Sequence, residues 1–205
     1  MTEDEARAWL NERFGVSRGT QLADFVARVI VEAGQQNLVS RATIDSIWRR
    51  HVVDSAQLVP LANDVPAGMW IDIGSGAGFP GMVAALLCDR EVMLVEPRRR
   101  RAIFLEQAAA SLGLGRRVTV AYRKIEQIQG RAAILSARAV APLPEVFAAA
   151  VHLSTPKTRW LLPKGRSALQ EVADARIGWH GVFHVEQSLT DPDSMIVLAE
   201  KVARR

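Results

Sequence analysis

Residues 70–81, with the sequence WIDIGSGAGFPG, are the part of this chain best suited to bind a ligand. A short apolar run contains a carboxylate, Asp72, and leads into a stretch dense in glycine. The glycines are Gly74, Gly76, Gly78 and Gly81. Because glycine has no Cβ, such a stretch can turn tightly and let a ligand approach the backbone closely. The pattern predicts a binding loop where a strand ends and a helix begins.

The loop fits two cofactors, a dinucleotide and S-adenosylmethionine. The spacing from Gly76 to Gly81 matches G-x-G-x-x-G, and Glu96 follows at about the 20-residue distance expected of a ribose-binding acid. A dinucleotide would bring a pyrophosphate next to Asp72, and the two negative charges would repel each other. S-adenosylmethionine carries an ammonium and a sulfonium and no phosphate, so the carboxylate favours it. We expect this cofactor to be bound by Asp72, Gly74, Ser75, Gly76, Gly78 and Glu96.

The elements around this loop predict an α/β fold. Short apolar runs indicate strands near residues 69–73, 91–95, 117–122, 132–136 and 158–162. Helices are expected near residues 80–88, 98–112 and 143–151. Such alternation predicts a mostly parallel sheet covered on both faces. Residues 179–185 and 195–202 are strand-like and flank the turn sequence TDPD, which predicts a closing antiparallel hairpin. A parallel sheet with this ending is typical of class I, Rossmann-like methyltransferases.

The first third of the chain is predicted to be helical. Apolar residues recur at helical spacing along residues 22–33 and again along residues 44–52. We expect residues 1–65 to form a helical N-terminal extension and residues 66–205 to form the cofactor-binding domain. The two parts are expected to make one compact unit.

Composition excludes several classes of protein. No apolar run approaches the roughly 20 residues that span a bilayer. The N-terminus is acidic, which is unlike a signal or transit peptide. The single cysteine, Cys88, excludes an internal disulfide and a multi-cysteine metal site, and it is interpreted as packing in a predicted helix. We expect a cytoplasmic protein without a metal and without a membrane partner.

Basic charge is concentrated in one run, Arg98-Arg99-Arg100-Arg101. The net charge is only +4, and a GC-rich genome would also favour arginine, so composition makes a nucleic acid no more than a candidate partner. The run opens a predicted helix, where the helix dipole disfavours cations. Arginine's planar fork suits phosphate. We therefore expect these four residues to contact phosphates, with Lys164, which follows the fifth strand, as a second contact.

Four motifs in order give the chain a family resemblance over nearly its whole length. Residues 72–81, DIGSGAGFPG, are similar to the signature of the RsmG (GidB) family, the bacterial 16S rRNA guanine-N7 methyltransferases. Residues 136–143, SARAVAPL, resemble that family's A-R-A-x-A-P-L stretch. Asn37-Leu38 with residues 50–55, RHVVDS, and residues 162–165, LPKG, match its other motifs. The resemblance implies S-adenosylmethionine as cofactor and 16S rRNA of the small ribosomal subunit as substrate.

The resemblance also implies further site residues. Gly74 and Phe79 are expected to contact the cofactor, and Arg138 to border the same pocket. Ile125 and Glu126 are expected to cover the adenine, although the chain reads KIE where the family usually has R-A-E.

Methylation of guanine N7 needs no general base, because this atom has a free lone pair and carries no proton. Catalysis would then depend on proximity and orientation. No residue is assigned a certain catalytic role, and the candidates are Arg138, His51 and Asp54. Arg138 fits a structural salt bridge with Asp72 or Glu126 as well as it fits a role at the substrate. His51 and Asp54 fit a buried hydrogen-bonded pair as well as a polar pair at the mouth of the site.

Three other functions remain compatible with the sequence. They are a methyltransferase for a small molecule, a nicotinamide-dependent oxidoreductase and a non-catalytic RNA-binding assembly factor. No obligate protein partner is evident, and we expect a monomer.

Overall fold

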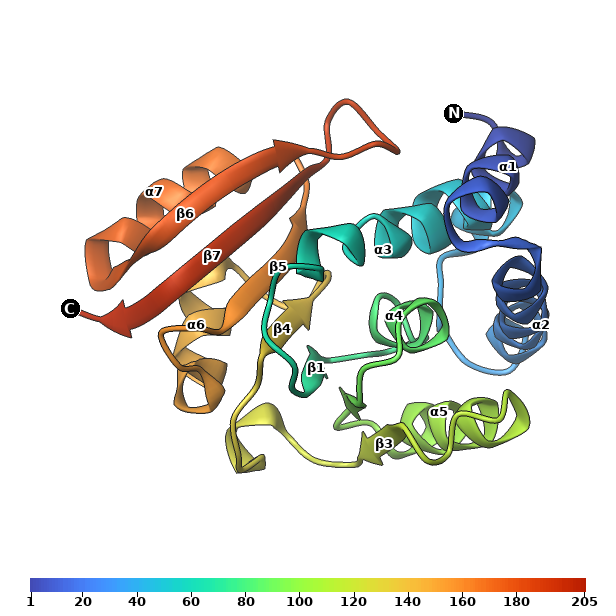
Figure 1. The fold of residues 1–205 in the computed structure, drawn as a ribbon, viewed down its shortest axis with the longest axis horizontal. Helices are drawn as coiled ribbons and strands as arrows, with labels where there is room; N and C mark the ends of the chain where they lie inside the picture. The colour runs from blue at the N-terminus through green and yellow to red at the C-terminus, as the bar shows by residue number, and fades with distance from the viewer.

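A computed structural model describes residues 1–205 and shows a seven-stranded sheet flanked by helices (Figure 1). The strand order is β3-β2-β1-β4-β5-β7-β6. The first five strands along the chain run parallel, and β7 lies antiparallel to both β5 and β6. The strands are β1 Trp70–Ile73, β2 Val92–Val95, β3 Val118–Ala121, β4 Ile134–Ala137, β5 Arg159–Lys164, β6 Trp179–Gln187 and β7 Met195–Arg204.

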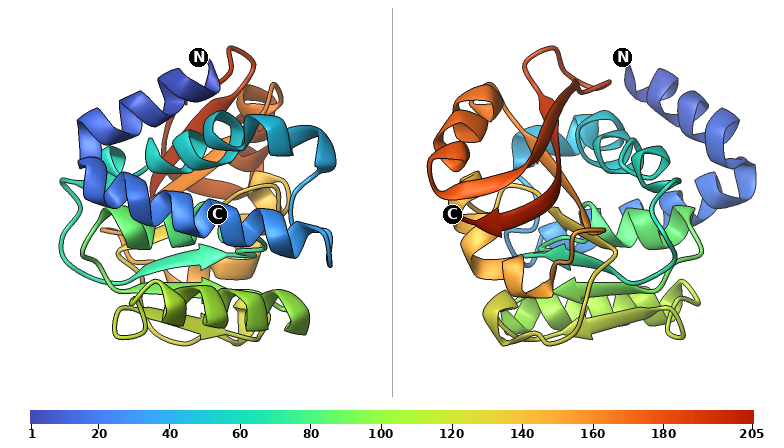
Figure 2. Two further views of the ribbon diagram at one scale, coloured as in Figure 1. Left: turned by 90° about the vertical axis from the view of Figure 1, so that its right-hand side faces the viewer. Right: turned by 60° about the vertical axis from the view of Figure 1, so that its left-hand side comes forward.

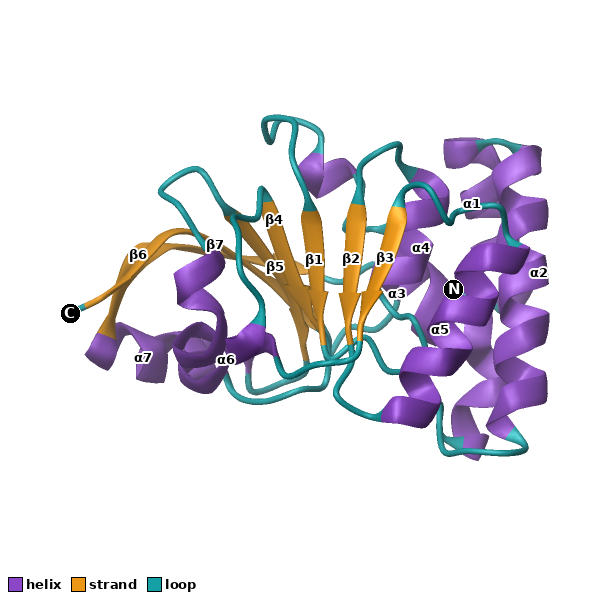
Figure 3. Cartoon of the chain, turned by 90° about the horizontal axis from the view of Figure 1, so that it is seen from below, coloured by secondary structure: helices purple, strands orange, loops and turns teal.

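Helices cover the sheet on both faces. The α-helices are α1 Glu3–Phe14, α2 Val16–Ala33, α3 Asp54–Ala56, α4 Gly81–Leu87, α5 Arg99–Ser111, α6 Leu143–Ala150 and α7 Ala168–Gly178. Short 3₁₀ and π segments are η1 Arg41–Ser46, η2 Trp48–Val53, η3 Pro60–Ala62, η4 Ile125–Gln127 and η5 Val151–Leu153. Figure 3 shows α6 and α7 beside β5 and β6, and α1, α2 and α5 at the other end of the molecule, near β3. No helix has the length and apolar character needed to cross a membrane.

The side chains of β1 explain the two-layered core. Successive residues of a strand point to opposite faces. Trp70 accordingly belongs to an apolar cluster shared with α2, α4 and α5, whereas Ile71 and Ile73 belong to a second cluster shared with α6 and α7. Both faces are buried, which is why every residue of β1 is buried and the apolar residues of the central strands do not simply alternate with polar ones.

The N-terminal helices pack onto the helical layer over one face of the sheet (Figure 2, left). Leu22, Phe25 and Val29 of α2 are fully buried in the cluster that also contains α4. The Glu3 carboxylate of α1 accepts hydrogen bonds from the backbone N–H groups of Trp48 (3.0 Å) and Arg49 (2.9 Å). This acid therefore caps η2, which lies far along the chain. One apolar cluster contains residues from both sides of the boundary expected between residues 65 and 66. The division into an N-terminal extension and a cofactor-binding domain therefore stays a prediction.

The fold predicted from the sequence is confirmed. Every strand and helix expected after residue 68 is present, with ends within two residues of those expected. Two features differ. Helix α7 was not expected, because its buried residues, Ala168, Val172 and Ala175, form too weak a stripe to stand out. The segment expected as one helix along residues 44–52 is instead a 3₁₀ turn followed by a π-helix, with Glu3 binding the first N–H groups of the latter.

Replacing Glu3 with alanine should lower the free energy of unfolding by about 1 kcal/mol, as the loss of a helix cap typically does. The two N–H groups at the start of η2 would lose their acceptor. Urea unfolding measures the change. Asp4→Ala is the matched control, since Asp4 is exposed in the same first turn and has no such contact. Equal stability of the two variants would contradict the capping role.

Candidate functional site

The loop after β1 lies where the strand order of the sheet reverses. β1 has β2 on one side and β4 on the other, and ligands of open α/β sheets bind outside the carboxyl ends of the strands at such a point. Gly74 has φ +65°, and a Cβ built on it would lie 2.8 Å from Cγ2 of Val140. Only glycine fits this position without displacing the segment that follows β4.

A cavity of about 740 Å³ opens beside this loop. Pockets of this size suit small-molecule ligands. It is lined by seven parts of the chain, namely residues 38–54, the glycine loop, the start of α5, the segment after β4, the end of β5, α7 and the loop between β6 and β7. The expected site residues that line it are His51, Asp54, Gly74, Ser75, Phe79, Arg101, Arg138 and Lys164. Those that do not line it are Asp72, Gly76, Gly78, Glu96, Arg98, Arg99, Arg100, Ile125 and Glu126.

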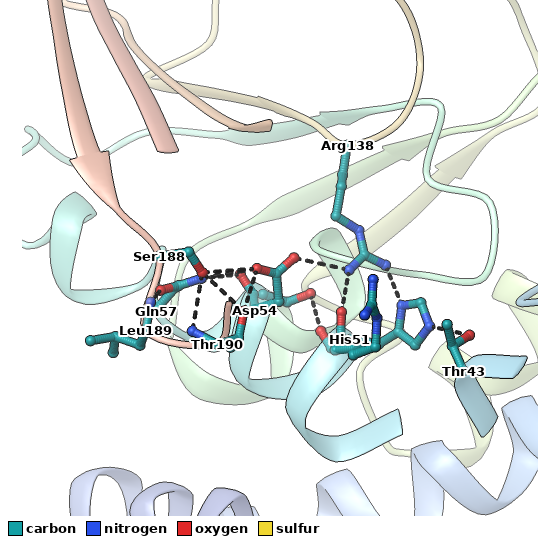
Figure 4. A network of polar contacts seen from close by, with 10 residues as sticks. Thr43, His51, Asp54, Gln57, Arg138, Ser188, Leu189 and Thr190 are labelled. Atoms are coloured by element: carbon teal, nitrogen blue, oxygen red, sulfur yellow. Dashed lines mark hydrogen bonds and ion pairs between the residues drawn. The ribbon is translucent and has the colours of Figure 1, made fainter. Parts of the chain in front are cut away.

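Arg138 joins the elements around the cavity (Figure 4). Its Nη1 donates to an Asp54 carboxylate oxygen and to the carbonyl of Arg50, both at 3.1 Å. Its Nη2 donates to Nδ1 of His51 at 2.8 Å, and its guanidinium lies 5.4 Å from the centre of the Phe79 ring. The salt bridge considered from the sequence is present, but with Asp54.

The acids first considered as partners of Arg138 are placed elsewhere. Asp72 is fully buried and is hydrogen-bonded to Ser136. Glu126 is exposed on η4 and forms no ion pair. Arg138 pairs with Asp54 instead, because the segment after β4 runs beside η2 and α3 at the cavity.

His51 is held in one tautomer. Arginine can only donate, so Nδ1 of His51 accepts, and Nε2 carries the proton and donates to Oγ1 of Thr43 at 2.9 Å. Burial, together with the charges of Arg138 and Arg50, lowers the pKa of His51 to about 3. The imidazole is therefore neutral near pH 7. It stacks on the Phe79 ring, with 5.2 Å between the two ring centroids. The direct His51–Asp54 bond considered from the sequence is absent, because Arg138 lies between the two.

Asp54 also binds the loop between β6 and β7. Its Oδ1 accepts hydrogen bonds from Gln57 Nε2 (3.0 Å), Thr190 Oγ1 (3.2 Å) and Ser188 Oγ (3.4 Å). These three partners of Asp54 were not predicted from the sequence. The turn sequence at residues 190–193 predicted a hairpin, but nothing in it indicated which distant side chain the loop would meet.

Asp72 and Glu96, the two acids beside the glycine loop, are buried and form no ion pair. Asp72 accepts a hydrogen bond from Ser136 Oγ at 2.6 Å, and its other oxygen has no hydrogen-bond partner. Burial raises the pKa of Asp72 to about 6, although the hydrogen bond from Ser136 opposes the shift. Glu96 accepts from the N–H groups of Gly76 (2.9 Å) and Arg98 (2.8 Å), so it fixes the loop to the end of β2.

Of the basic residues expected to contact phosphate, some are exposed without a side-chain partner and others are bound to protein groups. Arg98 and Arg99 are exposed at the start of α5. Arg100 and Arg101 donate to the carbonyls of Gln35 (3.2 Å) and Asn37 (2.6 Å), and so hold the segment after α2. Lys164 is also committed, since it pairs with Glu171 at 2.8 Å and donates to the Ala141 carbonyl at 2.7 Å. Ile125 is buried on η4 outside the cavity.

Comparison with protein families finds one model that matches. It is described as rRNA small subunit methyltransferase G (GidB), and it matches residues 18–191. Two similar relatives are both named ribosomal RNA small subunit methyltransferase G. The one from Rhizorhabdus wittichii is 47% identical over all of this chain and 95% of its own. The one from Zymomonas mobilis is 43% identical over 98% of this chain and 95% of its own.

Solved structures show a similar fold at low sequence identity. A putative S-adenosyl-L-methionine-dependent methyltransferase from Methanococcus maripaludis has a TM-score of 0.61 and 12% identity, covering 80% of this chain and 93% of that one. The glycopeptide N-methyltransferase MtfA, solved in complex with S-adenosyl-L-methionine, has a TM-score of 0.60 and 12% identity, covering 73% and 94%. These likenesses concern the fold alone.

Replacing Asp72 with asparagine should change how stability depends on pH. The folded-state pKa of about 6 lies above the ordinary 3.8, so the folded protein loses stability as pH rises from about 4 to about 6. The variant lacks this loss. The stability of Asp72→Asn relative to the unchanged protein should therefore rise by up to about 3 kcal/mol between pH 4 and pH 7.

Urea unfolding at a series of pH values measures this difference. Asp24→Asn is the control, because Asp24 is exposed and forms no hydrogen bond or ion pair through its side chain. A pH-independent difference for Asp72→Asn would show that the buried carboxyl has an ordinary pKa.

Proposed function

The chain belongs to the rRNA small subunit methyltransferase G (GidB) family, and on that premise we propose that it methylates N7 of a guanine in 16S rRNA, using S-adenosylmethionine. The resemblance read from the sequence is thereby confirmed at the level of the family. Membership favours an rRNA methyltransferase over the small-molecule enzyme, the oxidoreductase and the non-catalytic assembly factor. The geometry that supports the proposal most strongly is one cavity shared by the glycine loop, Phe79 and the Arg138–Asp54 pair.

The carboxylates beside the glycine loop fit a cationic cofactor. Asp72 and Glu96 lie on either side of the loop, neither forms an ion pair, and one oxygen of Asp72 has no partner. Uncompensated negative charge disfavours a pyrophosphate and favours a cation. S-adenosylmethionine, when bound, supplies an electrophilic methyl group on a positively charged sulfur. Gly74, Ser75 and Phe79, which line the cavity, would hold it.

Asp72 would act on the cofactor indirectly. Its carboxyl does not reach the cavity, and Ser75 Oγ donates to the Asp72 backbone carbonyl at 3.0 Å. The contribution of Asp72 is therefore the shape of the loop and the negative potential beneath it.

The protein groups around the cavity are arranged to position rather than to transfer protons. His51 is neutral and has both ring nitrogens in hydrogen bonds, and both oxygens of Asp54 are occupied. This agrees with the chemistry of guanine N7, which has no proton to remove. The rate would come from holding the base in line with the methyl group in a site shielded from water.

Exposed arginines would bind the RNA backbone. Arg98 and Arg99 lie at the start of α5, and Arg101 of the same run lines the cavity, so the run extends from the rim onto the surface. Arginine donates two parallel hydrogen bonds to phosphate. Since small-subunit rRNA is cytoplasmic, we infer the same location for this protein. We also propose that the protein is a monomer, as expected from the sequence.

Gly74→Asp should abolish S-adenosylmethionine binding and the methylation of small subunits taken from a strain that lacks the gene. The new side chain would be strained at φ +65° and would collide with Val140. Calorimetry measures binding, and mass spectrometry of the digested rRNA measures N7-methylguanosine. Gly113→Asp is the control, since Gly113 has φ +71° but no atom within 4 Å. The absence of N7-methylguanosine in a reaction with the unchanged, cofactor-binding protein would refute the proposal.

Arg99→Glu should weaken rRNA binding and lower the salt dependence of binding by about one unit of slope per lost phosphate contact. Cofactor affinity should stay the same, because Arg99 does not line the cavity. Arg116→Glu changes the charge equally at an exposed position that precedes β3, at the opposite ends of the strands. Filter binding over a range of salt concentrations tests both variants. An equal effect of the two would mean that the arginine run has no special role.

A further inference from the structure

Two charged side chains that line the cavity remain uncommitted. Most charged groups there have close partners. The committed groups are Arg101, Arg138, Lys164, Asp54 and Glu171. The exceptions are Arg50, whose side chain is 49% exposed, and Asp191, whose side chain is 32% exposed. Their nearest charged atoms, Nη1 of Arg50 and Oδ2 of Asp191, are 3.9 Å apart, which is too far for a direct hydrogen bond.

Asp191 is held in place by the loop that carries it. Its Oδ1 accepts from the N–H of Asp193 at 2.9 Å, which leaves Oδ2 free. The preceding residue, Thr190, is bound to Asp54, and the N–H of Leu189 donates to Gln57 at 2.9 Å. Asp54 in turn binds Arg138 (Figure 4), and the Arg138 guanidinium lies over the Phe79 ring. The free carboxylate oxygen is therefore fixed relative to the glycine loop.

Arg50 is fixed by the same network on the other side. Arg138 donates to its backbone carbonyl, and the neighbouring residue, His51, is bound by both Arg138 and Thr43. The guanidinium of Arg50 has no protein partner other than the distant Asp191. The cavity thus presents one free donor fork beside one free acceptor, both on an anchored backbone.

The Arg50–Asp191 pair matches the Watson–Crick edge of guanine. Guanine presents O6, an acceptor, next to two donors, N1–H and the N2 amino group. Arginine can only donate and an ionised carboxylate can only accept. Adenine presents a donor and an acceptor in the reverse order and would meet like groups. A carboxylate repels RNA phosphates, so its natural RNA partner is a base.

We propose that Arg50 and Asp191 select guanine, with Arg50 donating to O6 and Asp191 accepting from N1–H and N2–H. The inference rests on the function proposed above. Enzymes that modify a base extrude it from the stack and read its Watson–Crick edge. Binding by this edge leaves N7, on the other ring, without a protein partner and free to react. The two side chains lie side by side, so they can contact neighbouring groups on one edge of the base.

The test compares guanosine with inosine, which lacks the N2 amino group, placed at the methylated position of the rRNA. The unchanged enzyme should prefer guanosine by roughly 10-fold or more in kcat/KM, since a site built to bind an N–H group rejects an analogue without it. Asp191→Ala should lower kcat/KM for guanosine by roughly 10- to 100-fold and remove the preference, because the lost contact is the one that inosine lacks. S-adenosylmethionine affinity, measured by calorimetry, should not change.

Asp193→Ala is the matched control, because Asp193 lies in the same loop, pairs with Arg166 and does not line the cavity. It should keep the preference for guanosine. Asp191→Asn retains an oxygen that can accept from the N–H of Asp193, so it tests the same loss of preference if the alanine variant unfolds.

The outcomes separate this inference from the function it rests on. If Asp191→Ala slows guanosine and inosine equally, the residue only shapes the turn and the inference is overturned. No preference in the unchanged enzyme overturns it as well. If the unchanged enzyme binds S-adenosylmethionine but methylates neither RNA, the proposed function fails, and the inference fails with it.

Discussion

The pairing of Arg138 with Asp54 is the interaction on which the arrangement of the cavity depends. It connects three parts of the chain, since Arg138 follows β4, Asp54 begins α3, and the second oxygen of Asp54 binds Thr190 in the β6–β7 loop. Both side chains are mostly buried, with 17% and 13% exposed. Removing either partner of such a pair leaves a charge unpaired in a low-dielectric surrounding, which typically costs about 3–5 kcal/mol. The pair thus keeps the walls of the cavity at a fixed separation.

Charge is distributed unequally between the two sides of the site. Below the glycine loop lie Asp72 and Glu96, buried and without cationic partners. The α5 end of the rim carries the arginine run, and the cavity itself contains the ion pairs Arg138–Asp54 and Lys164–Glu171. A cationic cofactor and a polyanionic RNA have opposite electrostatic requirements. The protein meets both by burial, because the carboxylates are buried beneath the loop whereas Arg98 and Arg99 are exposed. One cavity can therefore accommodate ligands of opposite charge.

The sequence predicted the features that depend on local pattern. Alternating apolar runs located every strand, and the glycines located the binding loop, because a tight turn at positive φ leaves few alternatives to glycine at Gly74. Side-chain partners were not predictable in the same way. Asp54 meets Thr190 across 136 residues of chain, and the partner of Arg138 depends on how η2 packs beside β4. Likewise, two of the four arginines hold backbone carbonyls at Gln35 and Asn37, a role that no local pattern distinguishes from phosphate binding.

The contact between Asp54 and the β6–β7 loop has a consequence for how the protein matures. A ribosome makes the glycine loop, which ends at Gly81, before the loop that bears Thr190 and Asp191. Contacts between such distant segments form late, since the long intervening chain must first be ordered. A nascent chain therefore acquires its cofactor loop well before the opposite wall of its cavity. The cavity stays open on one side until the β6–β7 loop has been synthesised and folded, because Thr190 and Asp191 form part of its lining.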